Sequence, residues 1–202
     1  MKIMKKDVYQ ELLDLSKKIH TYGSVLTLLH WDQETYMPSG ATSPRSHQVA
    51  EMSLLIHKEK IGRKFKGLLE KLVSLSSGKI KAKGLSHEKR INIREWRRDY
   101  LKNTNLPPTF VKAFSQLTSE AGQIWQAAKK SNNFKLFAPT LEKIVSMNRQ
   151  KADILGFEDH PYDALLEAYE PCMTTKRVNG IFDHLQKELK NILKKISLSK
   201  PT

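Results

Sequence analysis

The first residues in this sequence whose types and spacing could do chemistry are a histidine and the glutamate that follows it. In zinc peptidases the pattern HExxH places two histidines one helical turn apart on one metal ion, and the glutamate polarises the metal-bound water. Here His87 and Glu88 begin the segment HEKRI, but Ile91 stands where the second histidine would be. An isoleucine cannot bind a metal ion. The segment therefore predicts the first turn of a surface helix.

Three further histidine–carboxylate pairs have a spacing that brings both side chains to one face of a helix. They are His30 with Glu34, His184 with Glu188, and His160 with Asp163. Two ligands do not make a stable metal site, so we interpret each pair as an ion pair between helical turns. The residue patterns give us no catalytic residue and no metal ligand in this chain.

No nucleophile motif accompanies these pairs. The sequence has neither a Gly-x-Ser-x-Gly elbow nor a P-loop. Its one cysteine, Cys172, follows Pro171 and lacks any sequence signal of thiol activation, so we expect a buried structural thiol. A single cysteine also excludes an internal disulfide framework, which suits a reducing compartment.

The stretch LLHWDQETYMPSGATSPR, residues 28–45, gathers aromatic and acidic side chains before a Pro-Ser-Gly break. Asp32 and Glu34 are two positions apart, so on a helix they point to different faces and cannot form one acid–base pair. Trp31 and Tyr36 bring apolar bulk with a polar tip. From residue types alone, the stretch predicts a helix end that packs against another element.

The elements that must position these side chains are predicted to be helices. Apolar residues over 8–29 step by four and three, which predicts one helix over about 7–36, roughly 45 Å long at 1.5 Å per residue. Pro38 and Gly40 end it. Ser43 is the expected N-cap of the next helix, with Pro44 at its first position.

Six more helices follow by the same periodicity, and no segment alternates as a strand would. The fold class is therefore all-α, a multi-helix bundle with a long N-terminal helical hairpin. Residues 1–78 would form the hairpin and a following helix, and residues 79–202 a helical bundle. The six helices are expected at 61–75, 86–102, 106–128, 141–155 closed by Gly156, 160–169 ended by Pro171, and from a cap at Thr174 or Thr175 to 196.

Composition excludes few functions. The chain has 202 residues and a net charge of +14, from 35 Lys and Arg against 21 Asp and Glu. Such charge is compatible with nucleic acid or an anionic surface, but the lysines are scattered, so we favour a solvated surface. The start, MKIMKKDVYQELLDL, lacks the apolar segment of a signal peptide, and no stretch reaches the ~18 apolar residues of a membrane span. We expect a cytoplasmic protein without a membrane segment.

The stretch at 28–45 also resembles a known family signature. LHWDQETYMPSGATSPRSHQVAEMS is similar to the N-terminal signature of the carboxypeptidase Taq family of metallocarboxypeptidases. That signature has a Trp-Asp-x-Glu-x-x-Met-Pro core followed by Gly, Arg and Gln-x-Ala. The matching residues here are Trp31, Asp32, Glu34, Met37, Pro38, Gly40, Arg45, Gln48 and Ala50.

Two later blocks resemble the same family in the same order. IWQAAKKSNNFKLFAPTLEKIVSMNRQKADILG, with Trp125, is similar to its Trp-x-x-Ala-Arg helix pair, and HPYDALLEAYEPCMTT to its Tyr-Asp-Ala-Leu-Leu block. Lys129, Asn133 and Cys172 stand where the family usually has Arg, Asp and Gly, and the last puts a tight turn after Pro171 in doubt. The signature residues of the second and third blocks are Trp125, Tyr162, Asp163, Glu170 and Pro171.

The resemblance implies an all-helical fold with a groove for a peptide C-terminus. It implies cytoplasmic homodimers that remove C-terminal amino acids one at a time, with broad specificity and with zinc, or often cobalt. The family's HExxH ligands and substrate-binding motifs lie beyond the region covered here. The chain is therefore identified as the N-terminal part of such an enzyme and is predicted to be inactive and metal-free alone. Its signature residues are expected to have structural roles.

Two alternatives remain open. The charge and the long helical seam also suit a basic helical module that binds nucleic acid or a partner helix. A shortened gene product could instead be regulatory or without function. The closing segment KKISLSKPT suggests a stop near an element boundary, as in an excised piece, a truncated gene or half of a split enzyme.

Overall fold

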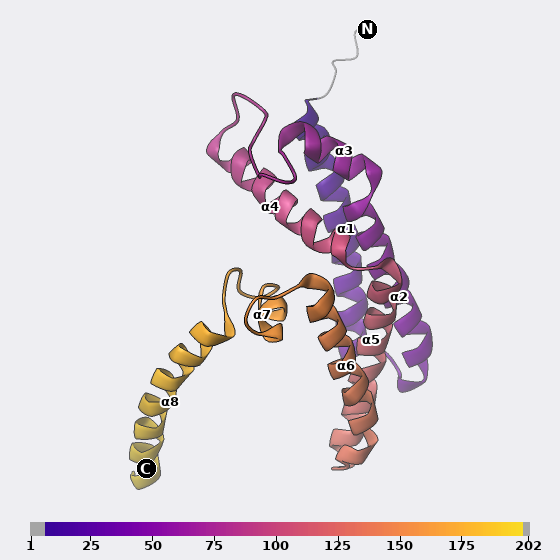
Figure 1. The fold of residues 1–202 in the computed structure, drawn as a ribbon. Coiled ribbons are helices and arrows are strands. Elements are labelled where there is room, and N and C mark those ends of the chain that lie inside the picture. The colour runs from indigo at the N-terminus through magenta and orange to yellow at the C-terminus, as the bar shows by residue number, and fades with distance from the viewer. Residues whose placement is uncertain (1–6, 200–202) are drawn as a thin grey trace. The chain divides into compact units, whose positions relative to one another are not determined.

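A computed structural model describes residues 7–199, which fold into helices joined by loops, the longest of them residues 73–86 between α3 and α4 (Figure 1). Within these residues there are eight α-helices, two short 3-10 turns and no strand beyond one isolated bridge between Val73 and Ile80. The predicted all-α class is confirmed. Residues 1–6 and 200–202, which belong to the opening segment MKIMKKDVYQELLDL and the closing segment KKISLSKPT, lie outside the described residues. No helix among 7–199 is long and apolar enough to cross a membrane.

The N-terminal helix, α1 (Val8–Thr35), agrees closely with the prediction from periodicity. The Asp7 carboxylate caps it by accepting from the Tyr9 N–H at 3.4 Å. Only the first half of its apolar seam is fully buried, at Leu12, Leu15 and Ile19. Because α1 is long, its C-terminal half lies away from the apolar core that its N-terminal half packs into.

The chain turns through η1 (Ser39–Ala41) into α2 (Thr42–Ile61). The prediction of Ser43 as N-cap is wrong, because helical geometry already begins at Thr42. The preceding 3-10 turn provides a hydrogen-bond partner for the first residue of α2, because the Thr42 hydroxyl donates to the Ser39 carbonyl at 2.7 Å. Pro44 therefore sits within the first turn, where its missing N–H costs little.

The main apolar core joins α1 to α3 (Arg63–Leu72) and α4 (His87–Asn105). α3 ends three residues before the predicted Leu75, because the Leu72 carbonyl accepts from the Lys81 N–H at 2.8 Å instead of from a further helical turn. Ser86 caps α4 through its hydroxyl. The core cluster consists of Tyr9, Leu12, Leu15, Ile19, Phe65, Leu68, Leu69, Leu72, Val73, Ile93 and Tyr100.

A second helix pair lies beside this core. α5 (Pro108–Lys130) packs along α2, and their buried residues include the small side chains Ser46, Ala50 and Ala121, which allow close approach. The Ser46 hydroxyl donates to a Glu120 carboxylate oxygen at 3.0 Å. Together α1, α2 and α5 provide the scaffold for the residues described below.

The last helices follow η2 (Phe134–Leu136). They are α6 (Ala138–Leu155), α7 (Pro161–Leu166) and α8 (Thr175–Leu198). Gly156 ends α6 with φ +80°, and the Thr174 hydroxyl caps α8, both as predicted. The chain forms two compact units, residues 1–147 and 148–202, so the loop at Gly78 lies within the first.

Candidate functional site

The signature at the end of α1 contains a guanidinium that fastens α2 to α1. Arg45 donates to an Asp32 carboxylate oxygen at 2.5 Å and to the Leu29 carbonyl at 2.6 Å. It also donates to the Gln48 amide oxygen at 3.0 Å. A planar guanidinium can satisfy three such acceptors at once, which an ammonium cannot do in the same geometry. Three signature residues, Asp32, Arg45 and Gln48, thus form one network that closes the helical hairpin.

The aromatic residues of the signature lie at the surface of the same turn. Trp31 and Tyr36 meet edge to face, with ring centroids 5.4 Å apart. Both rings are more than half exposed, while Met37 is half-buried and Pro38 leads into η1. The rings of Trp31 and Tyr36 therefore pack against each other, and both still expose apolar surface to solvent.

Glu34 instead lines a cleft between α1 and α5 with a volume of about 430 Å³. Trp125, from the second signature block, lines the same cleft, so two signature residues 91 positions apart in sequence share one site. The full lining is His30, Gln33, Glu34, Thr118, Ser119, Gly122, Gln123, Trp125 and Gln126.

A buried hydrogen-bonded pair forms the floor of this cleft. The Gln33 amide donates to the Ser119 carbonyl at 2.7 Å, and the Ser119 hydroxyl donates to the Gln33 amide oxygen at 2.9 Å. Both residues are buried, and a Cβ at Gly122 would lie in ordinary contact with the Gln33 amide nitrogen, at 3.9 Å. Sequence reasoning missed this pair. The signal was available, because Gln33 follows Leu29 by four and so continues the seam of α1.

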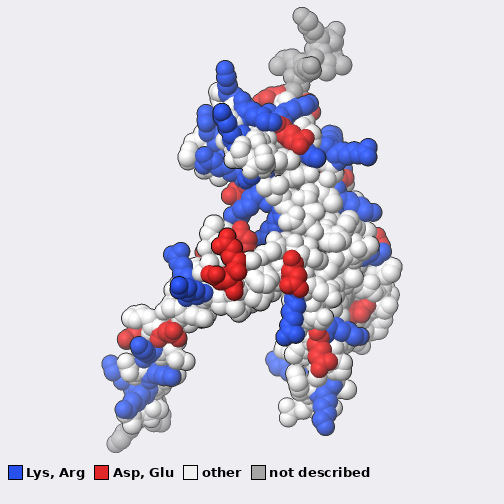
Figure 2. Space-filling model, in the orientation of Figure 1, with Lys and Arg blue, Asp and Glu red and all other residues white. Residues whose placement is uncertain are grey.

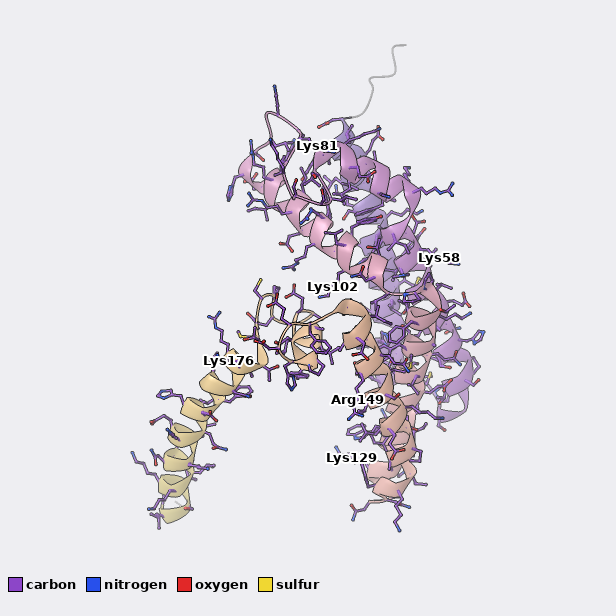
Figure 3. The ribbon with its side chains drawn as sticks, in the orientation of Figure 1. Lys58, Lys81, Lys102, Lys129, Arg149 and Lys176 are labelled. Carbon is purple, nitrogen blue, oxygen red and sulfur yellow. The ribbon has the colours of Figure 1, made fainter. Side chains whose placement is uncertain are left out.

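The walls of the cleft are polar and aromatic. The Trp125 ring already carries a cation, because the Lys129 ammonium lies 4.9 Å from its centroid on the last turns of α5 (Figure 3). Glu34 and His30 are exposed on the facing helix. The predicted ion pairs between His30 and Glu34 and between His184 and Glu188 do not form. His160 and Asp163 make no direct ion pair either, although the charge of His160 is a minor cause of the lowered pKa of Asp163. The arrangement can hold polar or cationic groups, and it offers no nucleophile paired with a base.

The third signature block stabilises a loop in the second unit. The Asp163 carboxylate accepts from the Thr175 N–H at 2.6 Å and from its hydroxyl at 2.5 Å, which joins α7 to the start of α8. These hydrogen bonds lower the pKa of Asp163. Tyr162, Glu170 and Pro171 are exposed beside it.

The cysteine lies in the turn that its identity had put in doubt. Cys172 has φ +64°, in the left-handed region that favours glycine, and its N–H donates to a Glu167 carboxylate oxygen at 2.8 Å. The turn therefore forms despite the replacement of the usual glycine. The prediction of a buried thiol is wrong, because Cys172 is exposed. A turn so close to the surface has no core against which to place the side chain.

No metal donors gather in the part of the chain that the structure describes. His87 and Glu88 are exposed at the start of α4, with Ile91 also at the surface. No group of three His, Cys, Asp or Glu side chains among residues 7–199 could hold an ion. The described residues thus offer no set of donors that fits a catalytic metal.

The described residues thus form an all-helical structure whose first hairpin is closed by Arg45 and whose α1 and α5 line a polar cleft. The family model "Carboxypeptidase Taq (M32) metallopeptidase" matches residues 11–202. The chain belongs to this family.

Relatives of known name support the assignment. Thermostable carboxypeptidase 1 of Pyrococcus furiosus is 32% identical over 202 residues, covering 96% of this chain and 38% of its own length. Carboxypeptidase 1 of Bacillus subtilis is 28% identical over 190 residues, covering 94% of this chain and 37% of its own length. The chain thus spans well under half of the length of these curated relatives.

Solved structures agree in fold. The BsuCP crystal structure has a TM-score of 0.85 at 28% identity, and covers 95% of this chain and 37% of its own. The structure of Pyrococcus furiosus carboxypeptidase Apo-Mg has a TM-score of 0.75 at 32% identity, covering 98% of this chain and 38% of its own. The helices described here therefore correspond to one part of a larger helical fold.

Proposed function

We propose that this chain forms the N-terminal helical part of a metal-dependent carboxypeptidase that releases C-terminal amino acids from peptides with broad specificity. The observation that carries the proposal is the match of the family model to residues 11–202 of this chain. The carboxypeptidases to which the chain is similar are more than twice as long. By the same family argument we expect a cytoplasmic homodimer.

The contribution of this chain to catalysis is positional. The Arg45 network fixes the α1–α2 turn, and the cleft between α1 and α5 offers a polar wall on which a peptide can lie. The metal, zinc or alternatively cobalt, would be held by the HExxH-bearing part of the family fold. That metal would supply an activated water for hydrolysis.

The chain alone is therefore expected to be inactive. Incubated with zinc or cobalt and a blocked dipeptide, the 202-residue chain should release no C-terminal amino acid, whereas Bacillus subtilis carboxypeptidase 1 serves as the positive control. Calorimetric titration should find no tight one-to-one zinc site. A stoichiometric zinc site on this chain, or release above the metal-only blank, would overturn the expectation.

The decisive test of the proposal uses the protein from its source cells. Native protein captured with an antibody against this chain should carry carboxypeptidase activity that a chelator removes and zinc restores. Mass spectrometry of the same sample gives the polypeptide that bears HExxH. Captured protein without such a polypeptide and without metal-dependent activity would contradict the proposal.

One surface favours the alternative of a basic binding module. A hollow of about 640 Å³ in the loop between α3 and α4 is lined by Lys79, Lys81, Lys83 and Arg90, together with Ser, Gly, Ile and Ala side chains. Figure 2 shows Lys and Arg gathered over this end of the first unit. If it binds phosphates, the affinity for duplex DNA will fall steeply between about 50 and 200 mM salt. No binding at low salt would remove this alternative.

A further inference from the structure

The loop between α3 and α4, residues 73–86, is held in shape by hydrogen bonds although it contains no helix. The Arg97 guanidinium on α4 donates to the Leu75 carbonyl at 2.8 and 2.5 Å and to the Ser74 carbonyl at 3.2 Å. The Ser74 N–H donates to the Lys79 carbonyl at 2.9 Å, which closes the turn between them. Hydrogen bonds from a charged guanidinium are among the stronger ones in proteins, so the loop positions its side chains before any ligand arrives.

Three lysines of this loop lie on its outer side. The segment KIKAK, residues 79–83, alternates basic and apolar side chains. Ile80 and Ala82 pack against the apolar core cluster, whereas all three lysines are exposed. Side chains two positions apart in an extended segment lie on the same side, so the alternation gathers the three ammonium groups. The fold therefore concentrates positive charge at this end of the first unit (Figure 2).

The hollow that these lysines line has a volume of about 640 Å³ and contains no carboxylate and no aromatic ring. Arg90, near the start of α4, is its fourth cation. The complete lining is Ser74, Ser77, Lys79, Ile80, Lys81, Ala82, Lys83, Gly84 and Arg90. All of these residues belong to the first unit, so the geometry of the hollow is internal to that unit.

None of the four cations has a carboxylate partner in the described part of the chain. The Lys81 ammonium donates to the Glu70 carbonyl at 2.8 Å, and the Arg90 Nε donates to the Leu85 carbonyl at 3.2 Å, so both keep their net charge. The Glu70 carboxylate lies 3.9 Å from the Lys66 ammonium instead. Four like charges around one hollow repel one another, and an anion bound among them removes that repulsion.

We propose that this hollow binds a small anion with two or more phosphate groups, taken from solution. A phosphate monoester carries about −1.5 to −2 charges at pH 7, so two such groups on one ligand match four cations. Ammonium groups bind phosphate oxygens as point charges, and a guanidinium adds directed donors. A volume of about 640 Å³ also lies within the range of small-ligand sites. The inference goes beyond the proposed function, because it involves neither a peptide nor a metal.

The lining favours a small phosphorylated anion over nucleic acid or an acidic peptide. Proteins that hold single-stranded nucleic acid stack its bases on aromatic rings, and this hollow has none. Duplex DNA presents one charge per ~1.7 Å along an extended axis, whereas the four cations surround one hollow. A carboxylate carries a single charge, so an acidic peptide would need several separate side chains in the space that two phosphate groups fill. The hydroxyls of Ser74 and Ser77 add donors for phosphate oxygens.

Calorimetric titration of the 202-residue chain with tripolyphosphate tests the hollow. Lys79→Gln with Lys83→Gln removes two lining charges, and the control, Lys17→Gln with Lys58→Gln, removes two charges elsewhere in the first unit. All four lysines are exposed, so the variants should fold. We expect the first double variant to raise the Kd at least about tenfold and the control to change it less than about threefold. Equal effects of the two double variants, or no binding to the unaltered chain at about 50 mM salt, would overturn the proposal.

Other anions test the ligand class. At equal ionic strength, citrate, an aspartate peptide and a short DNA duplex should each bind at least about tenfold more weakly than tripolyphosphate. Equal or tighter binding of citrate or the peptide would show a surface that attracts any anion, and tighter binding of the duplex would show a nucleic-acid surface. Either result overturns the phosphate site. Tripolyphosphate should also release the chain from vesicles that contain a phosphorylated inositol lipid, and retention on the vesicles would rule out a soluble ligand.

Hydrogen exchange locates the bound anion without any substitution. Saturating tripolyphosphate should slow exchange in peptides over residues 73–90 by at least about threefold, while peptides over α5 keep their rates. Slowing that is confined to other segments would place the anion elsewhere and overturn the assignment to this hollow.

Discussion

At the scale of single residues, several side chains in and beside the signature make hydrogen bonds that join one element to another. Arg45 holds two helices through three acceptors, Asp163 binds the first residue of α8, and Gln33 is paired within a buried floor. The two acidic signature residues, Asp32 and Glu34, lie on different faces of α1, as their spacing predicted. One anchors Arg45 and the other faces the cleft.

Replacement of Arg45 tests the anchoring role. Arg45→Lys keeps the charge but cannot serve Asp32, Leu29 and Gln48 together, so it should lower the free energy of unfolding by about 1–2 kcal/mol. Urea denaturation followed by circular dichroism measures the change. Arg63→Lys, at an exposed position on α3, is the control and should be neutral. A neutral Arg45→Lys would show that the network contributes no stability.

Cys172 adopts a backbone conformation that costs an L-residue about 1–2 kcal/mol. Cys172→Gly relieves that strain but gains freedom in the unfolded chain, so we expect a net local stabilisation of about 0.5–1 kcal/mol. Hydrogen exchange across residues 166–175 should slow by roughly two- to fivefold. Cys172→Ala removes the thiol and keeps the strain, so it should not slow exchange. Equal behaviour of the two variants would show that strain is not the cause.

His57 links stability to pH. Its side chain is 3% exposed and its Nε2 has no hydrogen-bond partner, so burial is the main cause of a lowered pKa, with a smaller opposing effect from Asn103. The unfolded chain therefore binds a proton near pH 6.5 while the folded chain does not, and stability falls as the pH drops below that value.

Substitution isolates this effect. His57→Gln should flatten the decline of the unfolding free energy between pH 7 and pH 5, whatever its cost at pH 7. His20→Gln, at an exposed site on α1, should leave the decline unchanged. Parallel curves for the wild-type chain and His57→Gln would mean that other groups cause the acid sensitivity.

At the scale of elements, helices were predictable because apolar periodicity and proline or glycine breaks determine them locally. The seam at 8–29 predicts α1 almost to its ends, and Gly156 marks the end of α6. The start of α2 and the end of α3 were not predictable, since a 3-10 turn and a long-range backbone hydrogen bond decide them. The cleft depends on α1 meeting α5, and no local pattern carries that information.

The contribution of the Gln33–Ser119 hydrogen bonds between α1 and α5 to the free energy of unfolding can be measured. Ser119→Ala removes a donor from a buried amide and should cost about 1–2 kcal/mol, whereas Thr118→Ala, exposed on the same helix, should cost little. Because Gln33→Leu removes the other partner, the double variant should lose less than the sum, with a coupling of about 1 kcal/mol by urea denaturation. Additive losses would indicate that the two side chains act independently.

At the scale of the whole molecule, the apolar core is unevenly distributed. Every residue of the core cluster lies between Tyr9 and Tyr100, within the first unit, and α8 buries none of its residues. A helix draws most of its stability in water from packing of its apolar face, so α8 on the isolated chain should open readily. This difference follows from where apolar residues are buried and not from helix propensity.

Hydrogen exchange monitored by mass spectrometry resolves this difference. In the isolated 202-residue chain at neutral pH, peptides from α1, α3 and α4 should stay protected for hours, while peptides from α8 exchange within minutes. Protection of α8 equal to that of α3 in the isolated chain would contradict this expectation, because it would show that the apolar side chains of α8 are covered within the chain.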